Sequence, residues 1–78
     1  MDIYPLVIIR DRYTGVYSGG YFTAWNMYLE DIPQEIEADD VSCYNFWYSY
    51  EGIVGLGKTP NEAIEDLQQK IKGRAENE

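Results

Sequence analysis

Apolar residues along the chain fall into short blocks separated by glycine-rich or acidic stretches. Ile3 to Arg10 is almost entirely apolar and rich in β-branched residues, which predicts a strand with at least one buried face. Pro5 must lie near the start of this strand or at an edge, since proline has no N–H for a ladder hydrogen bond. After a hairpin-length connection, Val16 to Asn26 predicts a second strand. Ser18-Gly19-Gly20 interrupts that strand and indicates either a bulge or a second tight turn.

The middle of the chain is first acidic and then aromatic. Residues 30–40 form an acidic connector, in which Pro33 could open a single helical turn. Val41 to Tyr50 then fits two templates, because alternation gathers its tyrosines on one face of a strand, whereas helical spacing separates its larger apolar residues from its serines and asparagine. Aromatic content favours the strand. Asp39 or Asp40 as an N-cap and the spacing of the polar residues favour a short helix, which we expect.

The last segment has the best-defined signals of the chain. Ile53 to Gly57 is short, apolar and bounded by glycines, as a final strand would be. Thr59 can cap a helix that begins at Pro60, and Glu62 three residues after Thr59 completes a capping box. Apolar residues then recur at helical spacing, so one stripe of this helix would pack on the sheet.

These elements predict one α+β domain over residues 1–73, because a chain of 78 residues has material for a single small core. We expect a three- or four-stranded, mainly antiparallel sheet packed against a C-terminal amphipathic helix, with a second short helix at Val41 to Tyr50. The C-terminal helix should run from Pro60 to Lys72 and stop at Gly73. Residues 74–78 would form a frayed tail.

Part of this pattern resembles a known family. Tyr4 to Asp11 is a tyrosine-proline-apolar strand, and Ile53 to Ile71 is a short strand that passes through Gly-x-Thr-Pro-x-Glu-Ala into an amphipathic helix. In these two segments, about a third of the chain, the sequence resembles the small antitoxin domain of the HicB family. The resemblance implies an antiparallel sheet with a packed helix and, more remotely, an antitoxin that binds a toxin partner. A long aromatic and acidic middle and the lack of an appended DNA-binding segment depart from the family pattern.

Charge is distributed unevenly along the chain. The net charge is -8, and the segment from Tyr13 to Gly57 contains seven carboxylates and no lysine or arginine. A surface of that sign repels nucleic-acid phosphates and anionic lipids and attracts basic proteins. We therefore expect no direct binding to nucleic acid or membrane. Because no apolar run approaches the length of a membrane span and no signal peptide is evident, we expect a soluble cytoplasmic protein, located in the host cytoplasm if a phage encodes it.

The residue types argue against catalysis. The chain has no histidine, which removes the commonest general base and the commonest transition-metal ligand. Cys43 is the only cysteine, so no internal disulfide can form, and we expect it to be a small buried hydrophobe. Alternating Glu35, Glu37 and Asp39 could collect a calcium ion, but the spacing of an EF-hand is lacking. We expect a non-enzymatic protein without catalytic residues, metal or cofactor.

Gly52 to Thr59, GIVGLGKT, fits the phosphate-binding pattern G-x-x-x-x-G-K-[ST]. In a true phosphate-binding loop the four residues between the outer glycines leave the strand and wrap their N–H groups around the phosphates. Here those four residues look like the strand itself, and Thr59 is a better N-cap than a magnesium ligand. We interpret the motif as a strand, a turn and a helix cap.

The functional prediction rests on the acidic segment and on an excess of aromatic rings over what one small core can enclose. Tyrosine and tryptophan beside carboxylates are typical anchors of protein interfaces. The predicted partner-binding residues are Glu30, Asp31, Glu35, Glu37, Asp39, Asp40, Trp47 and Glu51. In style the chain resembles the small acidic accessory proteins of phages and mobile elements, including anti-CRISPR and anti-restriction inhibitors that imitate nucleic-acid charge. The resemblance implies a counter-defence inhibitor that occupies the nucleic-acid-binding surface of a basic host protein.

Two further hypotheses concern the strands. Tyr17, Ser18, Gly19, Gly20, Tyr21 and Trp25 could wall a pocket in which a small ligand or nucleotide stacks over exposed backbone amides. The protein would then sequester that ligand. An exposed edge strand could also pair with a second copy to form a homodimer.

Overall fold

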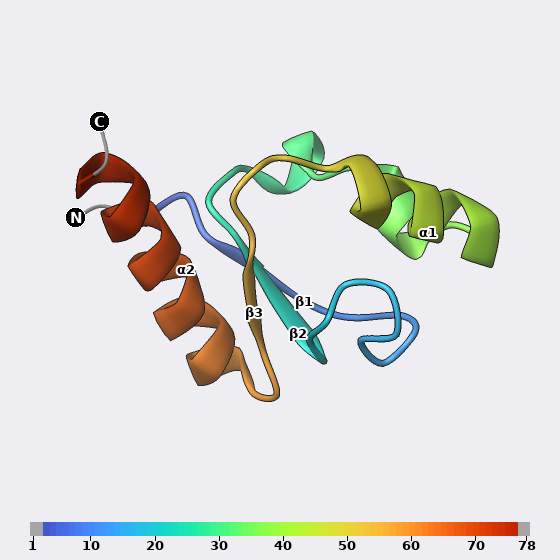
Figure 1. Cartoon of the computed structure of the whole chain (residues 1–78), viewed down its shortest axis with the longest axis horizontal. Coiled ribbons are helices and arrows are strands. Elements are labelled where there is room, and N and C mark those ends of the chain that lie inside the picture. The colour runs from blue at the N-terminus through green and yellow to red at the C-terminus, as the bar shows by residue number, and fades with distance from the viewer. Residues whose placement is uncertain (1–2, 77–78) are drawn as a thin grey trace.

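The computed structural model of the protein describes the backbone of residues 3–76 and the side chains of residues 3–73. It shows the predicted α+β fold, with a three-stranded antiparallel sheet and two α-helices (Figure 1). The elements in chain order are β1 (Val7–Arg10), β2 (Phe22–Trp25), the 3-10 turns η1 (Leu29–Asp31) and η2 (Gln34–Glu37), α1 (Asp40–Ser49), β3 (Gly55–Gly57) and α2 (Pro60–Glu76). The helices α1 and α2 lie on opposite sides of the sheet.

The pleat of the sheet determines which side chains face each helix. The strand order is β1-β2-β3, and Thr23 lies opposite both Ile9 and Leu56. Because side chains alternate along a strand, Thr23 and Trp25 point to the α1 side, and Phe22 and Ala24 point to the α2 side. The same register places Gly55 and Gly57 beneath α2.

The α2 side of the sheet is packed at very short range. Ala24, Ala63 and Leu67 are fully buried there. A Cβ atom at Gly55 would lie 2.6 Å from Leu67 Cβ and would also overlap the carbonyl oxygen of Ala63. Glycine in β3 therefore allows the helix backbone to rest directly on the strand.

Trp25 is the centre of the second core, on the opposite side of the sheet. Its ring is fully buried, and its Nε1 donates to Thr23 Oγ1 at 2.7 Å. Phe46 and Trp47 of α1, and Tyr50 directly after it, surround the Trp25 ring with centroids 5.7 to 6.4 Å away. These three residues belong to the apolar face that helical spacing predicts for Val41 to Tyr50, and the expected helix is confirmed. Cys43, on the same face, is fully buried as predicted.

The predicted strand from Val16 to Asn26 is confirmed only for Phe22–Trp25; its first half is wrong. Residues 11–21 form a compact loop instead. The buried Asp11 carboxylate accepts a hydrogen bond from the Gly15 N–H, and Gly15 and Gly19 have φ angles of 87° and 96°. Glycine supplies these left-handed conformations without strain, so the chain coils where alternation alone suggested extension.

Element ends differ from the predictions elsewhere too. The first strand is shorter than Ile3 to Arg10, and Pro5 precedes it in a cis peptide bond. The expected helical turn after Pro33 is present as η2, and Asp39 is the N-cap of α1. The predicted helix end at Gly73 is wrong, because α2 continues to Glu76. Residues 74–76 of the expected frayed tail are therefore helical, and residues 77–78 lie outside the described residues.

Candidate functional site

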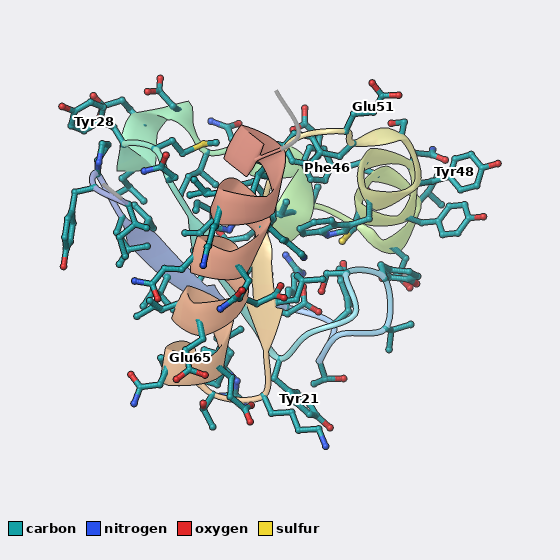
Figure 2. The ribbon with its side chains drawn as sticks, turned by 60° about the vertical axis from the view of Figure 1, so that its left-hand side comes forward. Tyr21, Tyr28, Phe46, Tyr48, Glu51 and Glu65 are labelled. Atoms are coloured by element: carbon teal, nitrogen blue, oxygen red, sulfur yellow. The ribbon has the colours of Figure 1, made fainter. Side chains whose placement is uncertain are left out.

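The outer face of α1 is apolar although it points away from the core. Val41, Tyr44 and Tyr48 follow one another at helical spacing, and 66%, 52% and 82% of their surfaces are exposed. The rings of Tyr44 and Tyr48 are stacked, with centroids 6.0 Å apart. Figure 2 shows Tyr48 projecting outward from α1. The helix thus presents one apolar face to the sheet and a second one to solvent.

The loop of residues 11–21 extends this exposed face. The Tyr17 ring meets Tyr44 edge-on at 6.0 Å, and Tyr13 meets Tyr17 at 5.4 Å. Val16, which is 72% exposed, lies beside them. Val16, Tyr17, Tyr44, Trp47 and Tyr48 line a shallow depression of about 160 Å³.

Two side-chain contacts hold the loop against η2 and the start of α1. The Tyr13 hydroxyl donates to the Ala38 carbonyl oxygen at 2.6 Å, and the Arg12 guanidinium donates to the carbonyl oxygen of Glu37. The Arg12 guanidinium also lies 5.6 Å from the centre of the Tyr13 ring. The loop that carries Val16 and Tyr17 is therefore held beside α1 before any partner arrives, which reduces the entropy lost on binding.

Carboxylates border the tyrosines at the N-terminal end of α1. Glu35, Glu37, Asp39 and Asp40 are all exposed and lie on η2 or at the start of the helix. A hydrogen bond from Ser42 Oγ, 2.8 Å from Asp39 Oδ1, lowers the pKa of Asp39. Burial raises the pKa of Tyr17, and the nearby Asp40 carboxylate raises it further. At neutral pH the Asp39 carboxylate is therefore charged and the Tyr17 hydroxyl remains a neutral donor.

We call this region the acidic-aromatic surface. Its members are Val16, Tyr17, Val41, Tyr44 and Tyr48 with the carboxylates Glu35, Glu37, Asp39 and Asp40. The sequence analysis predicted the four carboxylates. It did not select Val41, Tyr44 and Tyr48, although their spacing of three and then four residues is a signal that could have revealed a second apolar stripe on α1.

The other predicted partner-binding residues lie elsewhere. Glu30 and Asp31 are exposed on η1, directly after Tyr28, and Figure 2 places Tyr28 and Tyr48 at opposite sides of the molecule. Glu51 is exposed just beyond the end of α1. Of the seven predicted carboxylates, four therefore lie on the continuous stretch from η2 to the start of α1, and Glu35 lines a separate depression with Ser42, Asn45 and Ser49.

Trp47 is mainly a core residue. Its ring packs on Trp25 at 5.7 Å and on Phe46 at 5.1 Å, and only part of it lines the depression of the acidic-aromatic surface. Its buried Nε1 atom has no conventional hydrogen-bond partner. The neighbouring group is the Cys43 thiol, one helical turn earlier. Burial raises the pKa of this thiol, and the Trp47 indole N–H partly opposes that increase.

The residues predicted to form a ligand pocket are dispersed. Trp25 is fully buried, Tyr17 belongs to the acidic-aromatic surface, and Ser18 faces a different cavity of about 240 Å³. Gly19, Gly20 and Tyr21 line a third depression of about 150 Å³. The Gly19 and Gly20 N–H groups donate to Gly15 O and Ser18 Oγ at 2.9 and 3.4 Å. These two amides are therefore not free to bind a ligand.

The phosphate-like motif has the predicted strand-turn-cap structure. Gly55–Gly57 is β3, and the Glu62 N–H donates to Thr59 Oγ1 at 3.2 Å. The Glu62 carboxylate in turn accepts from the Lys58 N–H at 2.9 Å. The Lys58 N–H and the Thr59 hydroxyl are thus already engaged in hydrogen bonds with Glu62. In a phosphate-binding loop the corresponding groups are free to bind phosphate and magnesium.

Among the side chains of residues 3–73 the structure shows no cluster of three or more histidine, cysteine, aspartate or glutamate residues that could hold a metal ion. No helix within residues 3–76 is both long enough and apolar enough to cross a bilayer.

Comparison of the chain with protein-family models, with curated proteins and with solved structures gave no significant match.

Proposed function

We propose that this protein is a non-enzymatic binding protein whose acidic-aromatic surface occupies a basic surface of a partner protein. The observation that carries the proposal is the stacked pair Tyr44 and Tyr48, exposed on the outer face of a helix that begins beside Asp39 and Asp40 and follows the exposed Glu35 and Glu37 of η2. Tyrosines of this kind are frequent binding hot spots, because they bury a large rigid area and still donate a hydrogen bond.

Charge determines which partner fits. Net charge and the position of the carboxylates favour lysine- and arginine-rich surfaces, of the kind that proteins use to hold nucleic-acid phosphates. The finer proposal is that the chain is a counter-defence inhibitor of a phage or mobile element, which competes with nucleic acid for such a surface. Its support is the small size of the chain, its net charge of -8 and the preorganised loop that carries Tyr17.

Two variants that each remove four negative charges distinguish the effect of this surface on binding from the effect of the chain's net charge. The first variant changes the four carboxylates of the surface to amides: Glu35→Gln, Glu37→Gln, Asp39→Asn and Asp40→Asn. The matched control changes four exposed carboxylates elsewhere: Glu30→Gln, Asp31→Asn, Glu51→Gln and Glu65→Gln. All eight substitutions are at exposed positions, and asparagine at position 39 keeps an oxygen that can accept from Ser42 Oγ, so both proteins should fold.

The measurement is the affinity for a partner isolated by pull-down, together with competition between the chain and nucleic acid for that partner. We expect the first variant to bind roughly tenfold or more weakly and the control to bind within about threefold of the parent, since each exposed charge pair contributes up to about 1 kcal/mol.

Tyr48→Ser should weaken binding by at least about tenfold without loss of stability. Unchanged affinity in the first variant would exclude charge imitation, and equal losses in both variants would place the contact elsewhere.

A HicB-type antitoxin is the second candidate. It is supported by the strand order β1-β2-β3, followed by the capped helix α2, which is the arrangement that the resemblance implies. In that case the partner is a toxin encoded beside this chain. Growth rescue on co-expression with that toxin, lost in Tyr48→Ser, would favour this candidate over the counter-defence function.

A further inference from the structure

The two edges of the sheet differ in whether another element covers them. At the β3 edge, side chains of α2 take the backbone groups that point outward. The Leu56 N–H donates to Asp66 Oδ2 at 2.8 Å, and Lys70 Nζ donates to the Val54 carbonyl oxygen at 2.8 Å. Another strand therefore cannot pair with β3 without displacing α2.

The β1 edge has no such cover. The Asp11 N–H donates inward to the Tyr21 carbonyl oxygen at 2.7 Å, so alternation turns the backbone groups of Ile8 and Arg10 away from β2. The hydrogen bonds that side chains of β2 and the residues after it make to this part of the chain go to the carbonyl oxygens of Ile9, Ile3 and Pro5, and not to Ile8 or Arg10. β1 is the edge strand opposite β3 in the strand order β1-β2-β3. This edge is open for pairing.

The side chains at this edge also lack a covering element. Ile8 lies beside Ala24 on the α2 side of the sheet, but α2 packs over β3 and β2, and Ile8 stays 36% exposed. Val7 and Ile9 point to the opposite side, where they pack against the Trp25 core. An added strand would therefore extend both the hydrogen-bonded ladder and an apolar strip.

We propose that β1 pairs antiparallel with β1 of a second copy, about a two-fold axis at Ile8. In this register Ile8 lies opposite the partner's Ile8, and Leu6 lies opposite the partner's Arg10. Ile8 and Arg10 direct their backbone groups to the shared edge, and Leu6 would do so once pairing extends β1 by one residue, so the ladder is self-complementary. The product is a six-stranded sheet in which the two Ile8 side chains meet on the strip that α2 leaves uncovered.

The strongly acidic parts of the chain lie away from this strand. The chain as a whole repels itself, with a net charge of -8, but residues 3–12 contain Arg10 and Arg12 against only Asp11. The acidic-aromatic surface lies on α1 and the neighbouring loop and does not include β1. Association through β1 thus keeps the strongly acidic regions out of the contact, and it leaves the proposed binding function available in the dimer. A four-residue strand buries little surface, so the dimer should be weak, with a dissociation constant of roughly micromolar or higher.

Sedimentation equilibrium of the full chain over a wide concentration range tests the proposal. The average mass should rise from the 9.1 kDa of the monomer toward twice that value. Ile8→Lys, which sets two like charges against each other, should remain monomeric throughout. Leu29→Lys is the matched control, because Leu29 is 70% exposed on η1 and the charge change is the same; it should dimerise like the parent.

A mixing experiment distinguishes a broken interface from a variant that fails to dimerise because it is misfolded. Ile8→Lys and Ile8→Glu should each be monomeric alone and should associate when mixed, since the register places the two side chains directly opposite each other. Hydrogen exchange at the Ile8 and Arg10 amides should slow as the parent concentration rises. A parent that stays monomeric at all concentrations would overturn the proposal, as would a dimer that persists in Ile8→Lys or a mixture that fails to associate. Protection of β1 only when another protein is added would assign the edge to that protein.

Discussion

Two glycines determine how closely the C-terminal helix approaches the sheet. A Cβ at Gly55 would lie 2.6 Å from Leu67 Cβ, and one at Gly57 would lie 2.6 Å from Glu62 Cβ. Both glycines point toward α2 because they are two residues apart in a strand. Gly57, the turn at Lys58 and the cap at Thr59 supply the last three fixed letters of the phosphate-binding pattern, and Gly52 supplies the first. The second half of the match therefore follows from packing and capping requirements.

Gly55→Ala should destabilise the protein by about 1 to 3 kcal/mol or more, because the added methyl group overlaps backbone and side-chain atoms of α2 that cannot move without lifting the helix. Gly73→Ala is the control, since a Cβ there meets no atom within 4 Å and the residue lies inside α2. That substitution should stabilise the protein by about 0.5 to 1 kcal/mol. Urea denaturation monitored by circular dichroism measures both changes. Equal stability of the two variants would contradict the close packing described for β3.

At the scale of elements, α2 both covers the sheet and closes its edge. Asp66 Oδ2 accepts from the Leu56 N–H and lies 2.8 Å from Lys70 Nζ, which in turn donates to the Val54 carbonyl oxygen. The ion pair itself is about a third exposed, so it should contribute little. The hydrogen bonds to the strand backbone are the more valuable part, because they satisfy groups that have no other partner in the sheet.

Asp66→Ala should therefore cost about 1 to 2 kcal/mol of unfolding free energy. Glu65→Ala removes the same charge from the adjacent position of α2, where the side chain is exposed and points to solvent, and it should cost less than about 0.5 kcal/mol (Figure 2). Thermal and urea denaturation of the two variants can be compared directly. A loss shared equally by both would show that helix charge, rather than closure of the β3 edge, is responsible.

The elements that could be predicted are those whose signals are local. Thr59, Pro60 and Glu62 specify the start of α2 through capping chemistry that needs no other part of the chain. The loop of residues 11–21 could not be predicted in this way. Its shape depends on the buried Asp11 carboxylate and on the Tyr13 hydroxyl, which bonds to Ala38, 25 residues away. Alternation in Val16 to Tyr21 therefore suggested a strand that tertiary contacts override.

The residues of the candidate site were likewise predictable only where the signal was local. Its carboxylates were predictable from the absence of lysine and arginine between Tyr13 and Gly57. Its tyrosines were not selected, because α1 is apolar on two faces and periodicity alone does not say which face meets the sheet. Only the position of Trp25, which draws Phe46, Trp47 and Tyr50 inward, leaves Tyr44 and Tyr48 outside.

At the scale of the molecule, one thin sheet supports two cores. Ala24 and Trp25 are neighbours in β2, yet Ala24 packs under α2 and Trp25 packs under α1. If α1 separated from the sheet, the largest fully buried side chain of the described residues would enter water. The same separation would remove one face of a sheet that has only three short strands. The two halves of the protein should therefore unfold together.

Cys43 provides a direct probe of this cooperativity, because its thiol is fully buried on α1 and burial raises its pKa. We expect a thiol reagent to label native Cys43 roughly 10³-fold or more slowly than the unfolded chain, since labelling requires α1 to open. The urea midpoint for labelling should coincide with that of tryptophan fluorescence. Ser49→Cys in a Cys43→Ala background is the control, and this exposed thiol should react at once. Labelling of Cys43 at urea concentrations well below the fluorescence transition would instead show that α1 opens independently of the rest of the protein. The part of the acidic-aromatic surface on α1 would then have a lower local stability than the sheet.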